Sequence, residues 1–150
     1  MRERLVLCGH QEHKTRARGE RLYLRLTGED LRHTDVDSNV SLRLRDISRK
    51  LLAEVPDLLA DLLEIAAYVL AADAAVDRGK ATLPNMGDDW RRRFRFIIPV
   101  KRPALWASPE LTQLLVETLS FLSEDDYRFE FVEQRAPVPF SSYFPLDAPV

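Results

Sequence analysis

Apolar and polar positions alternate in two segments near the start of the chain, and a short apolar run comes before them. The alternating segments are residues 21–26 and 39–45, and the apolar run is residues 5–8. A period of two is typical of a strand with one buried face. We therefore expect three N-terminal strands, paired as an antiparallel meander.

The pattern then changes to one typical of a helix. From Leu62 to Val76 nearly every position is apolar, and Glu64 and Asp73 are the main interruptions. Pro56 is suited to a first helical turn, and Gly79 is suited to follow the last one. A helix that is apolar on most sides is usually central. We expect a buried central helix here.

The final pattern is a strand, a helix and another strand. Residues 94–100 and 127–131 alternate, and apolar positions three and four residues apart lie between them at 111–122. Ser108, Pro109 and Glu110 form a typical helix start. Two strands joined by one helix are expected to be parallel. The fold class predicted is α/β (α+β), with a mixed sheet of about five strands.

The chain is predicted to form one domain, residues 1–135, followed by a proline-rich tail or linker at 136–150. Prolines at 137, 139, 145 and 149 disfavour regular elements there.

Composition narrows the function classes. The 150 residues are 45% hydrophobic with a net charge of −2, which gives no overall attraction to nucleic acid or anionic membranes. One cysteine cannot form an internal disulfide, and the longest apolar stretch is broken by acids. We expect a cytoplasmic protein without a membrane span.

Cys8, His10 and His13 are candidate zinc ligands. A thiolate and two imidazoles suit zinc, and a water in the fourth position would make a small metal-dependent enzyme. The ordinary alternative is a buried cysteine with two histidines in a surface loop.

Trp90, Arg91, Arg93 and Arg95 are candidates for contact with a partner or a nucleic acid. On a strand the three arginines share one face, with Arg92 on the other. Arginines beside an aromatic residue can bind phosphate or stack on a base. The same pattern also fits a solvated strand face.

Asp73 is expected to be a buried polar residue, since it lies within the apolar helical segment. A buried carboxylate needs a partner, and Arg78 or the arginines at 91–93 are the natural ones. A structural ion pair is the simpler interpretation, and a catalytic acid is the alternative.

The sequence has no phosphate-binding loop, dinucleotide fingerprint, zinc-protease motif or nucleophile elbow. No catalytic residue is predicted, and this chain alone is expected not to be an enzyme.

Four segments resemble the N-terminal region of QueC-like proteins from bacterial anti-phage defence systems of the Qat and type IV CBASS types. QueC itself is 7-cyano-7-deazaguanine synthase. The segments are Asp61–Asp73, Trp90–Arg92 with Ile98–Val100, Pro103 with Trp106, and Leu119–Ser123 with Asp126–Phe131.

The resemblance implies that a PP-loop ATP-pyrophosphatase domain follows this region. ATP and zinc are expected only in that domain, so no cofactor is expected in this chain. The resemblance implies an accessory domain that positions a protein or nucleic-acid substrate or other defence proteins, or mediates assembly, with a homodimer among the expectations. A stand-alone interaction module is the alternative.

Overall fold

The computed structural model describes residues 3–16, 18–28, 37–42, 57–78 and 90–136. The expected helix boundaries at Pro56 and Gly79, part of the third expected strand and the proline-rich tail from residue 137 lie outside these described residues.

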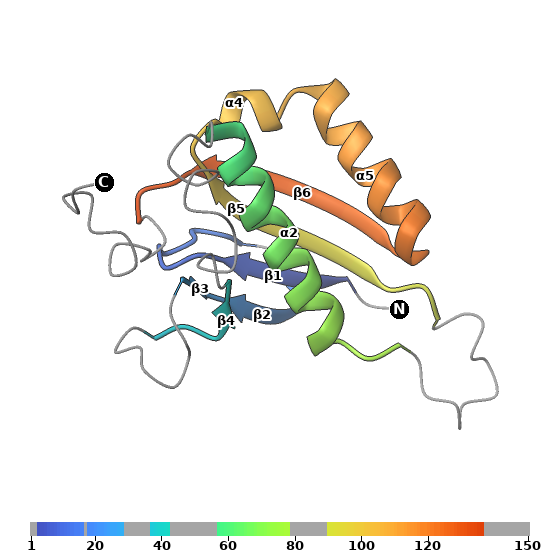
Figure 1. The fold of residues 1–150 in the computed structure, drawn as a ribbon. Helices are drawn as coiled ribbons and strands as arrows, with labels where there is room; N and C mark the ends of the chain where they lie inside the picture. Colours follow the sequence, from blue (N-terminus) through green and yellow to red (C-terminus); the bar gives the residue numbers. More distant parts are fainter. Residues whose placement is uncertain (1–2, 17, 29–36, 43–56, 79–89, 137–150) are drawn as a thin grey trace, which may run out of the picture.

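Six strands and three helices make up the described fold (Figure 1). In chain order they are β1 (Arg4–Cys8), β2 (Glu20–Leu24), β3 (Leu26–Thr27), β4 (Val40–Ser41), α2 (Asp57–Ala75), β5 (Arg93–Val100), α4 (Pro103–Trp106), α5 (Pro109–Ser123) and β6 (Asp126–Glu133). The α/β fold class is confirmed. The first alternating segment forms both β2 and β3, with Arg25 between them.

Four strands form one sheet in the order β2-β1-β5-β6, and every neighbouring pair in it is parallel. The expected parallel strand–helix–strand unit is confirmed, because β5 pairs with β6 across α4 and α5. The expected antiparallel meander is wrong, since β2 runs parallel to β1 and β4 runs parallel to β3. Parallel strands are usually buried on both faces, and the uninterrupted apolar run of β1 fits that environment.

All three helices pack on one face of the sheet. Val6, Phe96 and Ile98 lie on this face, under Ile65 of α2 and Trp106 of α4, in one continuous core. Figure 1 shows α2 lying across the strands and α5 lying on the β6 side of the sheet. None of the described helices is long and apolar enough to span a membrane.

α2 is central, as expected, but only one of its sides is buried. Its inward residues recur at helical spacing, whereas Leu62 and Leu70 are exposed. The inward residues are Asp61, Glu64, Ile65, Tyr68, Val69 and Ala72.

The opposite face of the sheet has a smaller apolar cluster. Leu5, Leu7 and Ile97 are buried there, and Val132 packs against them.

The strand order reverses between β1 and β5. The chain passes from β1 to β2 on one side and then returns to β5 on the other side. At the carboxyl end of this junction Gly9 has a φ of +88°, and a Cβ atom there would lie 2.8 Å from Pro99 Cγ. Glycine is therefore required for the backbone to turn so close to β5.

Candidate functional site

The three candidate zinc ligands do not converge. Cys8 is fully buried at the end of β1, and burial raises the pKa of its thiol well above the usual value. His13 Nε2 lies 2.6 Å from the Cys8 carbonyl oxygen, and His10 Nε2 lies 2.9 Å from the Leu26 carbonyl oxygen. The described part of the chain contains no group of three or more histidine, cysteine or acidic side chains that could hold a metal ion. Cys8 is therefore a buried cysteine, and the two histidines hydrogen-bond to backbone carbonyl groups.

We call Arg91, Arg93 and Arg95 the arginine stripe. Arg93 and Arg95 lie on the sheet face opposite the helices, as their alternation predicted, and Arg92 lies on the helix side. Acids of the neighbouring strand accompany the stripe: Arg91 Nε lies 3.0 Å from Asp126, and Arg95 Nη2 lies 3.3 Å from Glu130. Arg93 Nε is 3.8 Å from the same Asp126 carboxylate. The stripe is therefore a mixed-charge surface.

A buried ion cluster joins α2 to the amino ends of β5 and β6. Asp125 is fully buried, and Arg92 is only 2% exposed. Arg92 Nη2 donates to Asp125 Oδ2 at 2.7 Å, and the Arg92 backbone N–H donates to Oδ1 at 2.9 Å. Arg78 contributes a second cation, 3.1 Å from Asp125 Oδ2, and its guanidinium also lies over the Trp90 ring.

Asp73 belongs to this cluster but is not buried. Its side chain is 51% exposed and pairs with Arg92. The expected arginine partner is confirmed, whereas the expected burial is wrong, because Asp73 lies on the outward side of α2. The fully buried carboxylate that pairs with Arg92 is that of Asp125.

A second polar cluster lies at the carboxyl end of β5. Asp61 of α2 is fully buried, and three N–H groups donate to its carboxylate. They are the backbone N–H groups of Lys101 and Arg102, at 2.8 and 3.1 Å, and the Trp106 indole at 3.1 Å. Asp61 therefore joins the start of α2 to the turn between β5 and α4.

Glu64 lies one turn further along α2 and is 4% exposed. Its Oε2 accepts a hydrogen bond from the Gln134 amide at 3.1 Å. Burial raises its pKa to about 7, with a smaller contribution from Asp61, while Lys101 and Gln134 act in the opposite direction. The Glu64 carboxyl group can therefore exchange a proton near neutral pH.

Ligands of open α/β sheets usually bind at the carboxyl ends of strands where the strand order reverses. Glu64 lies one helical turn from Tyr68, which hydrogen-bonds the Gly9 backbone at that junction. Sequence reasoning missed Asp61 and Glu64, although their spacing of three residues on one helix side was a visible signal.

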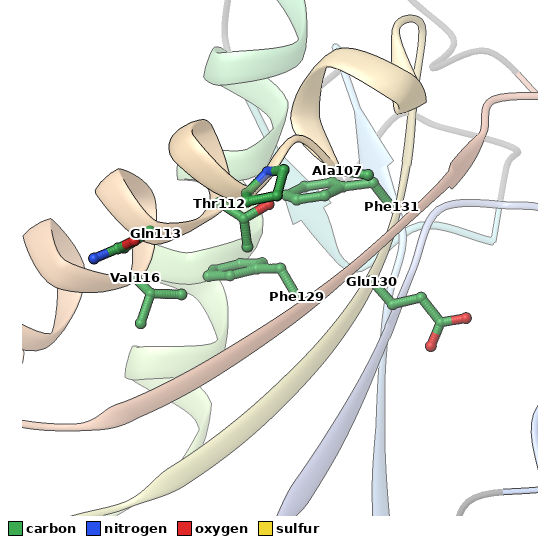
Figure 2. A pocket seen from close by; sticks show the side chains of 8 residues that line it. Ala107, Thr112, Gln113, Val116, Phe129, Glu130 and Phe131 are labelled. Atoms are coloured by element: carbon green, nitrogen blue, oxygen red, sulfur yellow. The ribbon is translucent and has the colours of Figure 1, made fainter.

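A pocket of about 520 Å³ lies between α5 and the outer strand β6. Figure 2 shows Phe129 and Phe131 pointing from β6 toward α5, where Thr112 and Val116 lie beside them and Gln113 points away. Glu130 points to the opposite side of the strand. The pocket has no titratable group among its inward side chains, so its chemistry suits apolar contact.

Comparison with known proteins gives no match among family models, curated proteins or solved structures.

Proposed function

We propose that this chain is a non-catalytic accessory domain that acts by binding protein partners, within a QueC-like, ATP-dependent 7-deazaguanine enzyme of anti-phage defence. The sequence resemblance supports the enzyme context. The PP-loop domain, which would carry ATP and zinc, is the first partner proposed.

One observation carries the binding role: most of the exposed large apolar side chains belong to two helices, α2 and α5. Six of the eight such side chains among the described residues belong to α2 and α5. Phe121 is the most exposed, at 86%. They are Leu59, Leu62, Leu70, Leu114, Phe121 and Leu122. Isolated exposed apolar residues are ordinary, but Leu114, Phe121 and Leu122 share one side of α5 by their spacing, and such a group is typical of an interaction surface.

Two of the buried acids, Asp61 and Asp125, support a non-catalytic role. Asp61 accepts from three N–H groups, and Asp125 is held by Arg92 and Arg78. A carboxylate engaged in this way cannot readily act as a nucleophile or general base. These two acids fasten α2 to the sheet.

Nucleic-acid contact through the arginine stripe stays a second prediction. Nearby Asp126 and Glu130 reduce its local positive charge, which weakens attraction to phosphates. We therefore place protein binding first.

The test begins with the native gene beyond Val150. An S-G-G-x-D-S segment there supports the proposal, whereas a stop codon favours a stand-alone module. The PP-loop domain from that gene is then titrated calorimetrically into this chain and into the Leu114→Asn/Phe121→Asn variant. We expect the variant to bind at least about tenfold more weakly, because two exposed apolar contacts are lost.

Tyr23→Asn is the matched control, since Tyr23 is an exposed apolar residue of β2. Its binding should equal that of the unmodified chain. The Arg93→Glu/Arg95→Glu variant tests the alternative contact surface. If this variant loses binding and Leu114→Asn/Phe121→Asn does not, the PP-loop domain binds the arginine stripe. That result would contradict binding through the apolar residues of the helices.

A further inference from the structure

The outer strand β6 has an edge that no other described strand pairs with. It is eight residues long, contains no proline or lysine, and carries three aromatic residues among charged residues of both signs. An unpaired strand edge is a ready template for another strand. The other outer strand, β2, has only five residues.

The β5–β6 hydrogen bonds show which backbone groups of β6 point outward. The Asp126 N–H donates to the Arg92 carbonyl at 2.9 Å, and the Gln134 N–H donates to the Val100 carbonyl at 3.0 Å. Backbone groups of successive strand residues point to alternate sides. Tyr127, Phe129 and Phe131 therefore present their N–H and C=O groups to the open edge.

We infer that this edge pairs with the β6 edge of a second copy of the chain, antiparallel, about a two-fold axis at Phe129. The inference rests on the proposed function, since it names one partner of the binding domain. Phe129 then faces Phe129 of the second copy, and Tyr127 faces Phe131. These residues direct their backbone groups outward, so each pair can exchange two hydrogen bonds.

Charge complementarity selects this register. Arg128 comes opposite Glu130 of the second copy, and two-fold symmetry repeats the contact. Both side chains lie on the solvent-facing side of the strand, with 71% and 51% of their surface exposed. They form the closer, non-hydrogen-bonded type of antiparallel pair, which favours opposite charges.

The neighbouring register is disfavoured. An axis at Glu130 gives an overlap of the same length, but it places Glu130 against Glu130 of the second copy. Arg128 would then lie opposite Val132. Like charges directly opposite each other destabilise strand pairing.

The pocket described above adjoins the same edge. Phe129 and Phe131 line it from β6, and Val116 lines it from α5. In the two-fold arrangement the Phe129 rings of both copies meet beside the two pockets. The aromatic row that already stacks within one chain, with 5.7 Å between the Phe129 and Phe131 ring centroids, would continue into the second copy.

Replacing a charged residue by one of opposite charge tests the pairing in the whole chain. Light scattering over a series of protein concentrations measures the mass of the particles in solution. We expect the unmodified chain to reach twice the 17.3 kDa of one copy. Arg128→Glu and Glu130→Arg each place like charges opposite each other, and each should weaken self-association about tenfold. An equimolar mixture of the two variants restores both opposite-charge contacts and should recover the dimer.

Disulfide trapping tests the register. Arg128→Cys/Glu130→Cys should form a linked dimer on mild oxidation, while either single replacement should not, and buried Cys8 serves as an internal control. Linking by Glu130→Cys alone would overturn the Phe129 register. A mass of one copy at every concentration, or a mixture that stays monomeric, would overturn the inference. Neither result affects the PP-loop titration, which uses other residues, so failure of the pairing and failure of the proposed function remain distinguishable.

Discussion

The two ends of α2 are both fastened to the sheet by buried acids, but the acids are stabilised in different ways. At the amino ends of β5 and β6, Asp125 faces the guanidinium groups of Arg92 and Arg78. At the carboxyl end of β5, Asp61 receives three neutral N–H donors, and Glu64 receives one from Gln134. Guanidinium charges therefore contact the buried carboxylate at the first end, and the dipoles of neutral N–H groups contact the buried carboxyl groups at the second.

The pKa values of Asp125 and Glu64 reflect this difference. Burial alone would raise the pKa of Asp125, but the hydrogen bonds and charge of Arg92, with a contribution from Arg78, lower it below the usual value. Burial dominates at Glu64 and raises its pKa to about 7. A guanidinium that hydrogen-bonds the carboxylate offsets burial at Asp125, whereas the charge of Lys101 does not offset burial at Glu64.

The largest effect is expected from Asp125→Ala. The change leaves Arg92 buried without its main counter-charge, which typically costs about 3–5 kcal/mol of folding free energy. Urea unfolding monitored by circular dichroism at pH 7 measures the loss. A loss below about 1 kcal/mol would show that Arg92 is not held by Asp125.

Arg92→Met/Asp125→Leu is the matched control for that prediction. Removing both charges leaves no fully buried unpaired ion, because Arg78 and Asp73, which lose their partners, are partly exposed to water. The double variant should therefore be more stable than Asp125→Ala. If the two variants are equally unstable, the cluster contributes through shape and not through charge.

Glu64→Gln is expected to have an intermediate, pH-dependent effect of opposite sign. The folded protein binds the Glu64 proton more tightly than the unfolded chain, so stability is lost as pH rises from about 4.5 to about 7. The variant lacks this loss and should be more stable by about 3 kcal/mol at pH 8, with little difference at pH 4.

Urea unfolding at both pH values measures this change. Glu117→Gln, at an exposed position of α5, controls for the loss of one negative charge. Equal stability of Glu64→Gln and the unmodified chain at pH 8 would mean that Glu64 is ionised without cost, and that burial does not distinguish Glu64 from Asp125.

The sequence predicted the elements better than their pairing. The alternation of β5 identified its helix-facing side correctly, because a strand has only two faces. The direction of β2 relative to β1 could not be obtained from alternation, which is the same in parallel and antiparallel sheets. The unbroken apolar run Leu5–Cys8 was the available signal for a strand covered on both faces.

The candidate site was harder to predict, and α2 explains why. Its apolar residues surround the helix, so hydrophobicity alone does not identify the inward side. Asp61 faces inward because N–H donors from the β5–α4 turn meet it, and those donors lie forty residues away in sequence. Asp73 looked equally buried, but it lies on the outward side.

Asp73→Ala should therefore have the smallest effect, although Asp73 binds the same Arg92 as Asp125. Half of the Asp73 side chain is exposed, and exposed ion pairs contribute about 0–1 kcal/mol because water and salt screen them. Arg92 keeps Asp125 as its buried counter-charge. Unfolding of Asp73→Ala and Asp125→Ala under one set of conditions measures the ratio of the two effects. A loss at Asp73 as large as the loss at Asp125 would show that burial of the carboxylate does not set the strength of this cluster.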